Sequence, residues 1–352
     1  MQLTLVIPDL IPPRPQGALT DVYLDLHAPD LAFLLARGKR RSMPGTSLEN
    51  WLGARFGLSW ERNLPAAPLS LLAEHGDPGE AWWLCVDPVH LAAHQDQVLL
   101  TGPEALGISR AEAEQWLNAL NRHFAGEGVS FHHIRPDRWY ARFATPLVVE
   151  NAALMEVAGR AINDHLPRGE QARRLMRLVN EIQMLLFSHP LNQTREAAGR
   201  PTVNSVWAWG GGRLPTVPIR PNGRLWADDL LAQGLARATH MPHSALPRDA
   251  RSVIEVADSH LVVLDALRAP AAYGDADAWR RSLRRLEEKW FAPLAHAFRK
   301  GRLTSLCLLA LDACHSMEFT LTGQARWKFW RRVRPLSHYA KAAPRIAAPD
   351  RR

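Results

Sequence analysis

Carboxylates and one histidine at the ends of predicted strands are the first candidates for chemistry in this sequence. Three aspartates each follow an apolar run, and a histidine stands three residues beyond the last of them: Asp9, Asp265, Asp312 and His315. Acidic and imidazole side chains at neighbouring strand ends are typical of a two-metal phosphotransfer site. Aspartate is also common as a turn former or helix cap where a strand leaves a sheet, so a purely structural role is the alternative.

A second group of candidates lies around a predicted helix end and the following strand. It combines donors suited to an anion with a run of glycines: His189, Asn192, Arg195, Asn204, Gly210, Gly211 and Gly212. The guanidinium of Arg195 has the forked geometry that suits phosphate or carboxylate. Consecutive glycines let backbone N–H groups approach a ligand closely. In the alternative interpretation, His189 and Asn192 cap the helix and the glycines form a turn.

Strands that alternate with helices predict the scaffold for these residues. In the last third of the chain, His260–Leu264 and Leu303–Leu311 have the character of buried strands, and Asp275–Lys300 has that of a long amphipathic helix. Gly169–Ser188 predicts another helix, and Val203–Trp209 alternates as a strand. This βαβ rhythm indicates an α/β fold with a mostly parallel sheet and helices on both faces.

The middle of the chain has a different pattern. Ser109 and Glu112 have the spacing of a helix capping box, and Val129–Ile134 and Arg138–Phe143 resemble a hairpin. We therefore expect residues 1–80 to form the first part of the α/β core and residues 81–145 a strand-rich insertion or subdomain. Residues 146–325 would complete the core, and residues 326–352 would form a basic C-terminal tail.

The charge is concentrated in that tail. The 352 residues include 43 Lys and Arg against 35 Asp and Glu, a formal net charge of +8. Residues 326–352 hold nine of the basic residues and one acidic residue, which leaves 34 of each sign in residues 1–325. The tail interleaves these cations with Trp327, Phe329 and Trp330. Such a segment could bind nucleic acid or an anionic membrane, or its aromatic residues could dock on the body of the protein.

The overall composition excludes several classes of protein. Hydrophobic residues at 47% and charged residues at 22% are typical of a globular chain. No apolar run approaches the roughly 18–20 residues of a membrane-spanning helix, and the N-terminus lacks a signal-peptide pattern. The three cysteines have no zinc or disulfide spacing. We expect a soluble cytoplasmic protein.

The segment from Asn180 to Gly212 resembles a known family. Its pattern His189-Pro-x-Asn192-x-x-Arg195, followed by Asn204-x-x-Trp207 and glycines, is similar to archaeal-type cofactor-independent phosphoglycerate mutases. Those enzymes belong to the alkaline-phosphatase superfamily of metalloenzymes. Over residues 1 to about 335 the chain resembles more closely a bacterial group often named phosphoglycerate mutase or RpfE-type regulatory protein. The elements that carry this resemblance are Asp87-Pro-Val-His90, Leu120-Asn-x-His123-Phe124, Arg138-Trp-Tyr140, Gly159-Arg160, Asn180-Glu181 and Gln183-Met184.

The resemblance implies the mutase-like fold with an inserted strand-rich region, but the catalytic pattern departs from the family's. Asp9 is followed by Leu10 where the mutases have Gly, and Asp265 lacks the Gly-His pair that supplies further ligands. Three hydroxyl residues follow the first helix without a recognisable nucleophile motif: Ser42, Thr46 and Ser47. Phosphoryl transfer through a phosphoserine needs both metals and the nucleophile together.

These departures predict a mutase-like protein with a degenerate metal site, non-catalytic and either regulatory or partner-binding. We expect no cofactor, a possible phosphorylated or acidic small ligand near Arg195, and a protein partner of unknown identity. The first alternative is a metal-dependent phosphoglycerate mutase or phosphohydrolase with Mn²⁺ or Zn²⁺ at Asp9, Asp265, Asp312 and His315. The second alternative is a nucleic-acid or membrane adaptor that acts through the basic tail.

Overall fold

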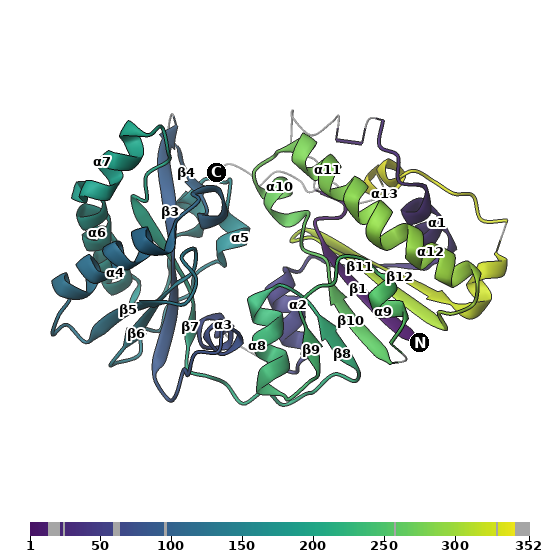
Figure 1. Cartoon of the computed structure of the whole chain (residues 1–352), viewed down its shortest axis with the longest axis horizontal. Helices are drawn as coiled ribbons and strands as arrows, with labels where there is room; N and C mark the ends of the chain where they lie inside the picture. The colour runs from purple at the N-terminus through teal and green to yellow at the C-terminus, as the bar shows by residue number, and fades with distance from the viewer. Residues whose placement is uncertain are drawn as a thin grey trace. The chain divides into compact units, whose positions relative to one another are not determined.

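The computed structural model describes residues 1–12, 22–23, 25–58, 64–94, 97–256, 258–328 and 330–341. The chain forms two compact units (Figure 1). The first unit comprises Met1–Leu52, Arg220–Ala236 and His240–Arg352, and the second comprises Gly53–Ile219 with Arg237–Thr239. Residues 342–352 of the expected tail lie outside the described residues.

The first unit contains a seven-stranded sheet that is mostly parallel, as the sequence predicts. Its strands, in spatial order, are β2 (Lys39–Pro44), β12 (His315–Thr322), β11 (Ser305–Leu311), β1 (Gln2–Pro8), β10 (Ser259–Val263), β8 (Arg224–Trp226) and β9 (His243–Ser244). The five strands from β11 to β9 run parallel to one another. β12 and β2 add an antiparallel edge, in which His315 pairs with Pro44. The central strands are apolar on both sides, which is typical of a sheet covered by helices.

One long helix packs against this sheet and contacts residues 29–37 near the N-terminus. It runs from α11 (Ala276–Leu286) through a π-helical stretch, η3 (Glu287–Phe291), into α12 (Ala292–Arg299). The Asp275 side chain caps its start by accepting the Ala278 N–H at 2.8 Å. Within η3, the Glu287 carboxylate accepts the first N–H groups of α1 (Pro29–Arg37), from Asp30 at 2.6 Å and Leu31 at 3.1 Å. A carboxylate at a helix N-terminus is favoured by the unpaired donors and by the helix dipole.

The first unit also contains several shorter helices. They are α2 (Leu48–Arg55), α8 (Leu230–Ala238), α9 (Arg251–Ile254), α10 (Arg268–Ala272) and α13 (Leu336–Lys341). The first residues of α2 and most of α8 belong to this unit. α10 begins a few residues after β10. These positions matter because α2, α8 and α10 each supply or flank a charged side chain of the site described below.

The second unit is an antiparallel sheet covered by helices. Its strands are β3 (Trp82–His94), β4 (Gln97–Thr101), β5 (Val129–His133), β6 (Trp139–Phe143) and β7 (Ser205–Gly212). They pair in the order β4-β3-β6-β5, with β7 also paired to β3. α4 (Arg110–His123) and α6 (Ala172–Ser188) bury Trp116, Leu117 and Ile182 against the sheet. The predicted capping box is present, because the Ser109 side chain accepts the Glu112 N–H while Glu112 accepts the Ser109 N–H.

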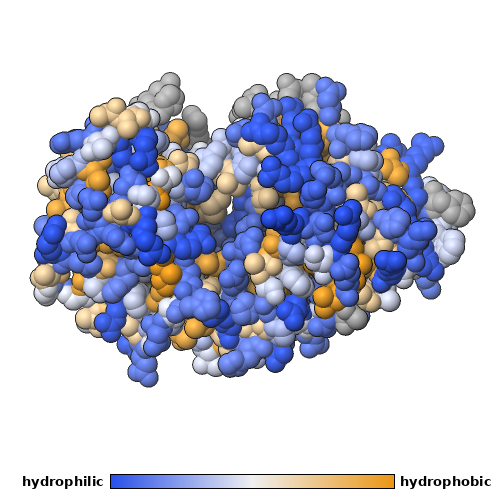
Figure 2. All heavy atoms as spheres, in the orientation of Figure 1, coloured by the Kyte–Doolittle hydropathy of each residue, from blue (hydrophilic) through white to orange (hydrophobic). Residues whose placement is uncertain are grey.

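The second unit is larger than the insertion expected at residues 81–145. It begins at Gly53, includes α3 (Ala66–Ala73), which packs on β3 and β7, and extends to Ile219. The reason is that the strand predicted at residues 203–209 pairs with β3 rather than with the parallel sheet. Across both units, no helix of the described residues is long and apolar enough to cross a membrane. The face shown in Figure 2 is mainly hydrophilic, with apolar side chains scattered over it.

Candidate functional site

The three predicted aspartates of the first unit follow neighbouring strands at the same edge of the parallel sheet. Asp9 leaves β1 with a left-handed φ of 56°, and its N–H donates to the Leu311 carbonyl at 2.9 Å. Asp312 follows Leu311 at the end of β11, and Asp265 follows Leu264, whose N–H donates to Val6. The carboxyl ends of parallel strands are where α/β folds bind ligands. β1, β10 and β11 are parallel neighbours, so their carboxyl ends and these three aspartates lie at one edge of the sheet.

Asp312 and His315 belong to the turn that joins β11 to β12. One carboxylate oxygen of Asp312 accepts the N–H groups of Cys314 at 2.8 Å and His315 at 3.1 Å. The Asp312 N–H donates to the Ser316 hydroxyl at 3.2 Å. These bonds are those of an aspartate that shapes a turn. They match the structural alternative for this residue.

Arg268 places a fixed positive charge among the carboxylates of this edge. It lies three residues after Asp265, at the start of α10, and its Nη2 is 2.8 Å from Oε1 of Glu49 in α2. The Arg268 and Glu49 side chains are only 12% and 10% exposed. An arginine and a carboxylate at this distance form a charge-assisted hydrogen bond that is well shielded from water.

Further carboxylates lie within the electrostatic reach of Arg268. The guanidinium interacts with Asp229 and Asp9 as well as with Glu49, and it also acts on Asp265. Asp229 follows the short strand β8 and caps α8 by accepting the Ala232 N–H at 2.8 Å. We call Glu49, Asp229, Asp265, Asp9 and Arg268 the strand-end cluster. It contains four acidic side chains around one arginine.

Burial and the charge of Arg268 shift the pKa values of the carboxylates in the strand-end cluster in opposite directions. Burial raises the pKa of Asp229 to about 6 and also raises that of Asp265, and Arg268 only partly offsets this effect. For Glu49 the balance is reversed, because its direct bond to Arg268 outweighs burial and lowers the pKa. Burial acts to lower the pKa of Arg268, but Glu49 and Asp229 hold it above its usual range. Arg268 therefore stays charged and neutralises Glu49 first.

The strand-end cluster does not fit a divalent metal. Among the described residues, no group of three or more His, Cys, Asp and Glu side chains is arranged to hold one. The predicted set of Asp9, Asp265, Asp312 and His315 is thus not brought together as a metal centre in that part of the chain. The guanidinium of Arg268 supplies positive charge among these carboxylates and occupies an oxygen of Glu49, which lies outside the predicted set.

Sequence reasoning missed Arg268, Glu49 and Asp229. Arg268 had a recognisable signal, because it is a cation three residues after a strand-end aspartate. Asp229 follows a strand of only three residues, which is too short to recognise from its pattern. Glu49 lies 219 residues before Arg268, and nothing in the local sequence connects them.

The predicted anion-binding arginine of the second unit is buried and bonded to protein on all three of its nitrogens. Arg195 lies in α7 (Pro190–Ala197) and is 1% exposed. Its Nε donates to the Pro201 carbonyl at 2.7 Å, its Nη1 to Glu112 Oε1 at 2.8 Å, and its Nη2 to the Leu106 carbonyl. These bonds tie α7 to the start of α4. We call Arg195, Glu112 and the neighbouring Arg200 the helix-start cluster.

The asparagines and the histidine of the same segment also bond to backbone groups. The Asn192 amide donates to the carbonyls of Leu186 and Val203 and accepts the Val203 N–H at 2.9 Å. Asn204 bonds the N–H and the carbonyl of Leu91 in β3 at 2.8 and 2.9 Å. His189 caps α7 through its Nδ1, which accepts the Leu191 N–H at 3.3 Å. Together they join α6, α7, β3 and β7. Asn192 bonds the end of α6, as the capping alternative predicts, whereas the His189 side chain caps the start of α7.

The three glycines end β7 against protein atoms. A Cβ at Gly210, whose φ is 65°, would lie 2.8 Å from the Cβ of Ala66. A Cβ at Gly211 would meet the Trp82 ring at 2.5 Å, and one at Gly212 would meet Pro65 at the same distance. Glycine is needed here because α3 and β3 approach the strand closely. A ligand at residues 189–212 stays a prediction.

The second unit also holds a buried ion pair on elements that the family resemblance singled out. Asp87 in β3 is fully buried, and its Oδ1 lies 2.9 Å from Nε of Arg138. The indole N–H of Trp209 donates to its other oxygen at 2.7 Å. Burial raises the pKa of Asp87 to about 6, against the opposing effect of Arg138 and Trp209. The ion pair links β3 to the residue that precedes β6, and the Trp209 bond links β3 to β7.

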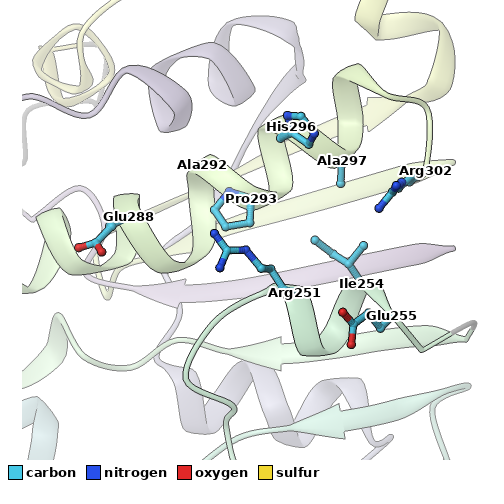
Figure 3. Close-up of a pocket in the computed structure, with 9 residues that line it drawn as sticks. All are labelled: Arg251, Ile254, Glu255, Glu288, Ala292, Pro293, His296, Ala297 and Arg302. Carbon is cyan, nitrogen blue, oxygen red and sulfur yellow. The ribbon is translucent and has the colours of Figure 1, made fainter.

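A cavity of about 510 Å³ opens between α9 and α12 of the first unit (Figure 3). Arg251 and Glu255 line one side, and Glu288, His296 and Arg302 line the other. Because α9 precedes β10 and α12 precedes β11, the cavity lies toward the amino ends of these strands. That is the opposite end from the strand-end cluster. Because the lining side chains carry both positive and negative charges, the cavity favours neither anionic nor cationic ligands.

Comparison with curated proteins finds distant relatives among phosphoglycerate mutases. The chain is 30% identical over 136 residues to a probable 2,3-bisphosphoglycerate-independent phosphoglycerate mutase of Geobacter sulfurreducens. The matched segment covers 37% of this chain and 33% of that protein. It is 29% identical over 175 residues to the 2,3-bisphosphoglycerate-independent phosphoglycerate mutase of Methanothrix thermoacetophila. The matched segment covers 44% of this chain and 44% of that protein. The chain thus spans less than half the length of these curated relatives.

Among solved structures, the PH0037 protein from Pyrococcus horikoshii has a similar fold. Its TM-score is 0.57 at 14% identity, over 94% of this chain and 90% of that one. No protein-family model matches the chain. Over the matched segments the chain is distantly similar in sequence to phosphoglycerate mutases, and its mixed α/β fold is similar to that of the PH0037 protein.

Proposed function

We propose that this chain is a mutase-like protein without metal-dependent phosphoryl transfer, and that it acts by binding a partner. The observation that carries the proposal is the Arg268–Glu49 pair, 2.8 Å apart, at the strand ends where the homologous fold places its chemistry. A guanidinium can bind phosphoryl oxygens, but it does not coordinate and activate a water molecule as paired metals do. Arg268 thereby neutralises part of the negative charge of the cluster and occupies one oxygen of Glu49.

The regulatory part of the proposal rests on the resemblance to the RpfE-type bacterial group and on the departures of the mutase pattern. Asp9 lacks the following glycine, and Asp265 lacks the Gly-His pair. Ser47, one of the hydroxyl residues after the first helix, accepts the Asn50 N–H at 3.3 Å at the start of α2. The missing histidine removes a metal ligand that the family's phosphoserine reaction uses, and Ser47 is bonded as a helix cap.

A divergent phosphohydrolase or mutase is the second candidate, and the strand-end carboxylates favour it. Asp9, Asp229 and Asp265 are oxygen ligands of the kind that Mn²⁺ accepts. This candidate requires the Arg268 side chain to leave the cluster so that a metal can enter. The two candidates therefore differ in whether the intact chain binds a divalent cation.

Calorimetric titration of the full chain with Mn²⁺ and Zn²⁺, paired with a phosphoglycerate-isomerisation assay, separates the candidates. We expect no stoichiometric metal binding and no turnover above the protein-free rate. The Arg268→Ala variant, which exposes the carboxylates, is expected to gain Mn²⁺ affinity. Arg251→Ala is the matched control, because Arg251 is 74% exposed and lies at the other end of the strands. Stoichiometric binding by the unmodified chain, with turnover that Asp265→Asn abolishes, would overturn the proposal.

A further inference from the structure

The C-terminal segment folds back onto the edge strand β2. The guanidinium of Arg331 donates to the Gly38 carbonyl at 2.6 Å, and that of Arg37 donates to the Arg331 carbonyl at 2.7 Å. Gly38 immediately precedes β2. Two segments almost 300 residues apart in the sequence are thereby joined side by side. The basic region is consequently part of the folded first unit up to at least this point.

This contact brings together the cations of both segments. β2 contributes Lys39, Arg40 and Arg41, all exposed, and residues 326–334 contribute five more basic residues. Neither residues 37–44 nor residues 323–341 contain Asp or Glu. We call residues 39–41 and 326–334, excluding position 329, which the structure does not describe, the basic aromatic surface.

Tyr339 shows that the two sets of cations converge. Its ring packs edge-on against Phe319 at 5.4 Å, and Phe319 is the ladder partner of Arg40. Burial raises the pKa of Tyr339, while Arg40, Arg331 and Arg334 all act to lower it. Three guanidinium groups from both segments thus lie around one phenol. Their mutual repulsion is tolerated in the free protein and would be relieved by an anionic partner.

Acidic groups of the neighbouring strand do little to neutralise this surface. Glu318 in β12 faces Arg41 across the ladder at 3.9 Å, with the Arg41 side chain 69% exposed. Such a long, exposed ion pair contributes less than about 1 kcal/mol. Glu318 also accepts the Thr320 hydroxyl at 3.0 Å. The positive charge of the surface remains available to a partner.

Exposed indoles lie among these cations. Trp327 and Trp330 are 64% and 67% exposed. The guanidinium of Arg326 lies 5.2 Å from the centre of the Trp327 ring and covers part of it. Burying the Trp327 ring in a lipid headgroup layer would also remove Arg326 from water. A nucleobase can instead stack on the Trp327 ring while Arg326 stays in place beside it. Arginine also outnumbers lysine here, which suits bidentate phosphate contacts.

We propose that the basic aromatic surface binds single-stranded nucleic acid through phosphate contacts and base stacking. This inference is independent of the strand-end cluster. β2 and the C-terminal segment together supply the phosphate-binding cations, and Trp327 supplies a stacking platform. Recognition is of the backbone and of unpaired bases, without readout of a sequence.

Fluorescence anisotropy of the full chain with labelled single-stranded oligonucleotides of mixed sequence tests the proposal. We expect the logarithm of the binding constant to fall linearly with the logarithm of salt concentration. The double variant Arg40→Ala/Arg334→Ala should reduce that slope by about 1.4, and Trp327→Ala should weaken binding about tenfold. Arg251→Ala is the matched control and should leave binding unchanged.

Circular dichroism of each variant verifies that it is folded, so that lost binding reports on the surface. Absence of binding at low salt would overturn the proposal. So would binding that the double variant leaves unchanged, because it would show that β2 takes no part. Binding to phosphatidylserine vesicles without binding to oligonucleotides would also overturn it and would assign the surface to a membrane.

Discussion

The strand-end cluster and the helix-start cluster each contain a shielded arginine, but their charge balance is opposite. In the strand-end cluster, Arg268 faces four carboxylates, and the pKa values of Asp229 and Asp265 are raised. In the helix-start cluster, Arg195 and Arg200 both contact the single carboxylate of Glu112. Burial acts to raise the pKa of Glu112, but bonds from Ser109 and Arg195 outweigh it and lower the pKa to about 2.

This difference separates an ion cluster whose arginine is fully bonded from one in which carboxylates outnumber the arginine. Every nitrogen of Arg195 donates within its own unit, so that cluster is complete as it stands. The strand-end cluster keeps more carboxylates than its arginine can satisfy, and Glu49 retains a buried oxygen without a hydrogen bond. Excess negative charge at the strand ends has a cost in stability.

The largest loss of stability is expected when Arg195, the buried arginine of the helix-start cluster, is removed. Arg195→Ala should lower the free energy of unfolding by about 3–5 kcal/mol, because it leaves Glu112 and two carbonyls without their buried partner. Urea unfolding followed by tryptophan fluorescence measures this. Arg200→Ala is the control, since Arg200 is 43% exposed and binds the same carboxylate, and it should cost less than about 1 kcal/mol. Equal effects would show that the two arginines do not differ in role.

Removing Arg268 from the strand-end cluster should lower the free energy of unfolding by less, and the size of this loss should depend on pH. Arg268→Ala is expected to lower the free energy of unfolding by about 2–3 kcal/mol at pH 8, where the unopposed carboxylates are ionised. At pH 5 the loss should be smaller, because carboxylates whose pKa values are already raised can take up protons. Urea unfolding at the two pH values tests this. An equal loss at both would contradict an excess of acid in the cluster.

The smallest effects should be opposite trends with pH in the two clusters. The lowered pKa of Glu112 gives stability that is present above about pH 4.5 and is lost as pH falls toward 2. The raised pKa of Asp229 gives stability that is present below its ordinary value of 3.8 and is lost as pH rises through 6. Glu112→Gln and Asp229→Asn should each flatten their own trend by about 1–2 kcal/mol.

Thermal unfolding of both variants between pH 3 and pH 8 distinguishes these trends. Asp229→Asn keeps an oxygen that can accept the Ala232 N–H, so the cap of α8 is preserved. If Asp229→Asn flattened the acid side of the profile instead, the sign of its pKa shift would be wrong. Asp277→Asn provides a control, because that side chain is 76% exposed.

Much of the fold followed from local patterns. The capping box at Ser109, the hairpin of β5 and β6 and the helix that begins after Asp275 are set by residues close together in sequence. The boundaries of the second unit did not follow, because β7 could have joined either sheet. Its pairing with β3 depends on contacts such as those between Asn204 and Leu91, 113 residues apart.

Some features of the candidate site could likewise be predicted from local patterns, and others could not. Apolar runs that end in aspartate were enough to predict that Asp9, Asp265 and Asp312 follow strands at one edge of a parallel sheet. They could not show that Arg268 pairs with Glu49, since that contact spans 219 residues and depends on how α2 and α10 pack. Nor could they show that Arg195 is enclosed, since burial is a property of the packed unit.

The sequence by itself determined which residues end strands, which helices are capped and where the positive charge is concentrated. These features depend on near neighbours and on periodicity, which the linear order of residues records directly. Only the tertiary structure decided which charges meet: Arg268 with Glu49, Arg195 with Glu112, and β2 with the basic C-terminal segment. Side-chain reach is a few ångströms, so partners far apart in the chain are set by packing alone.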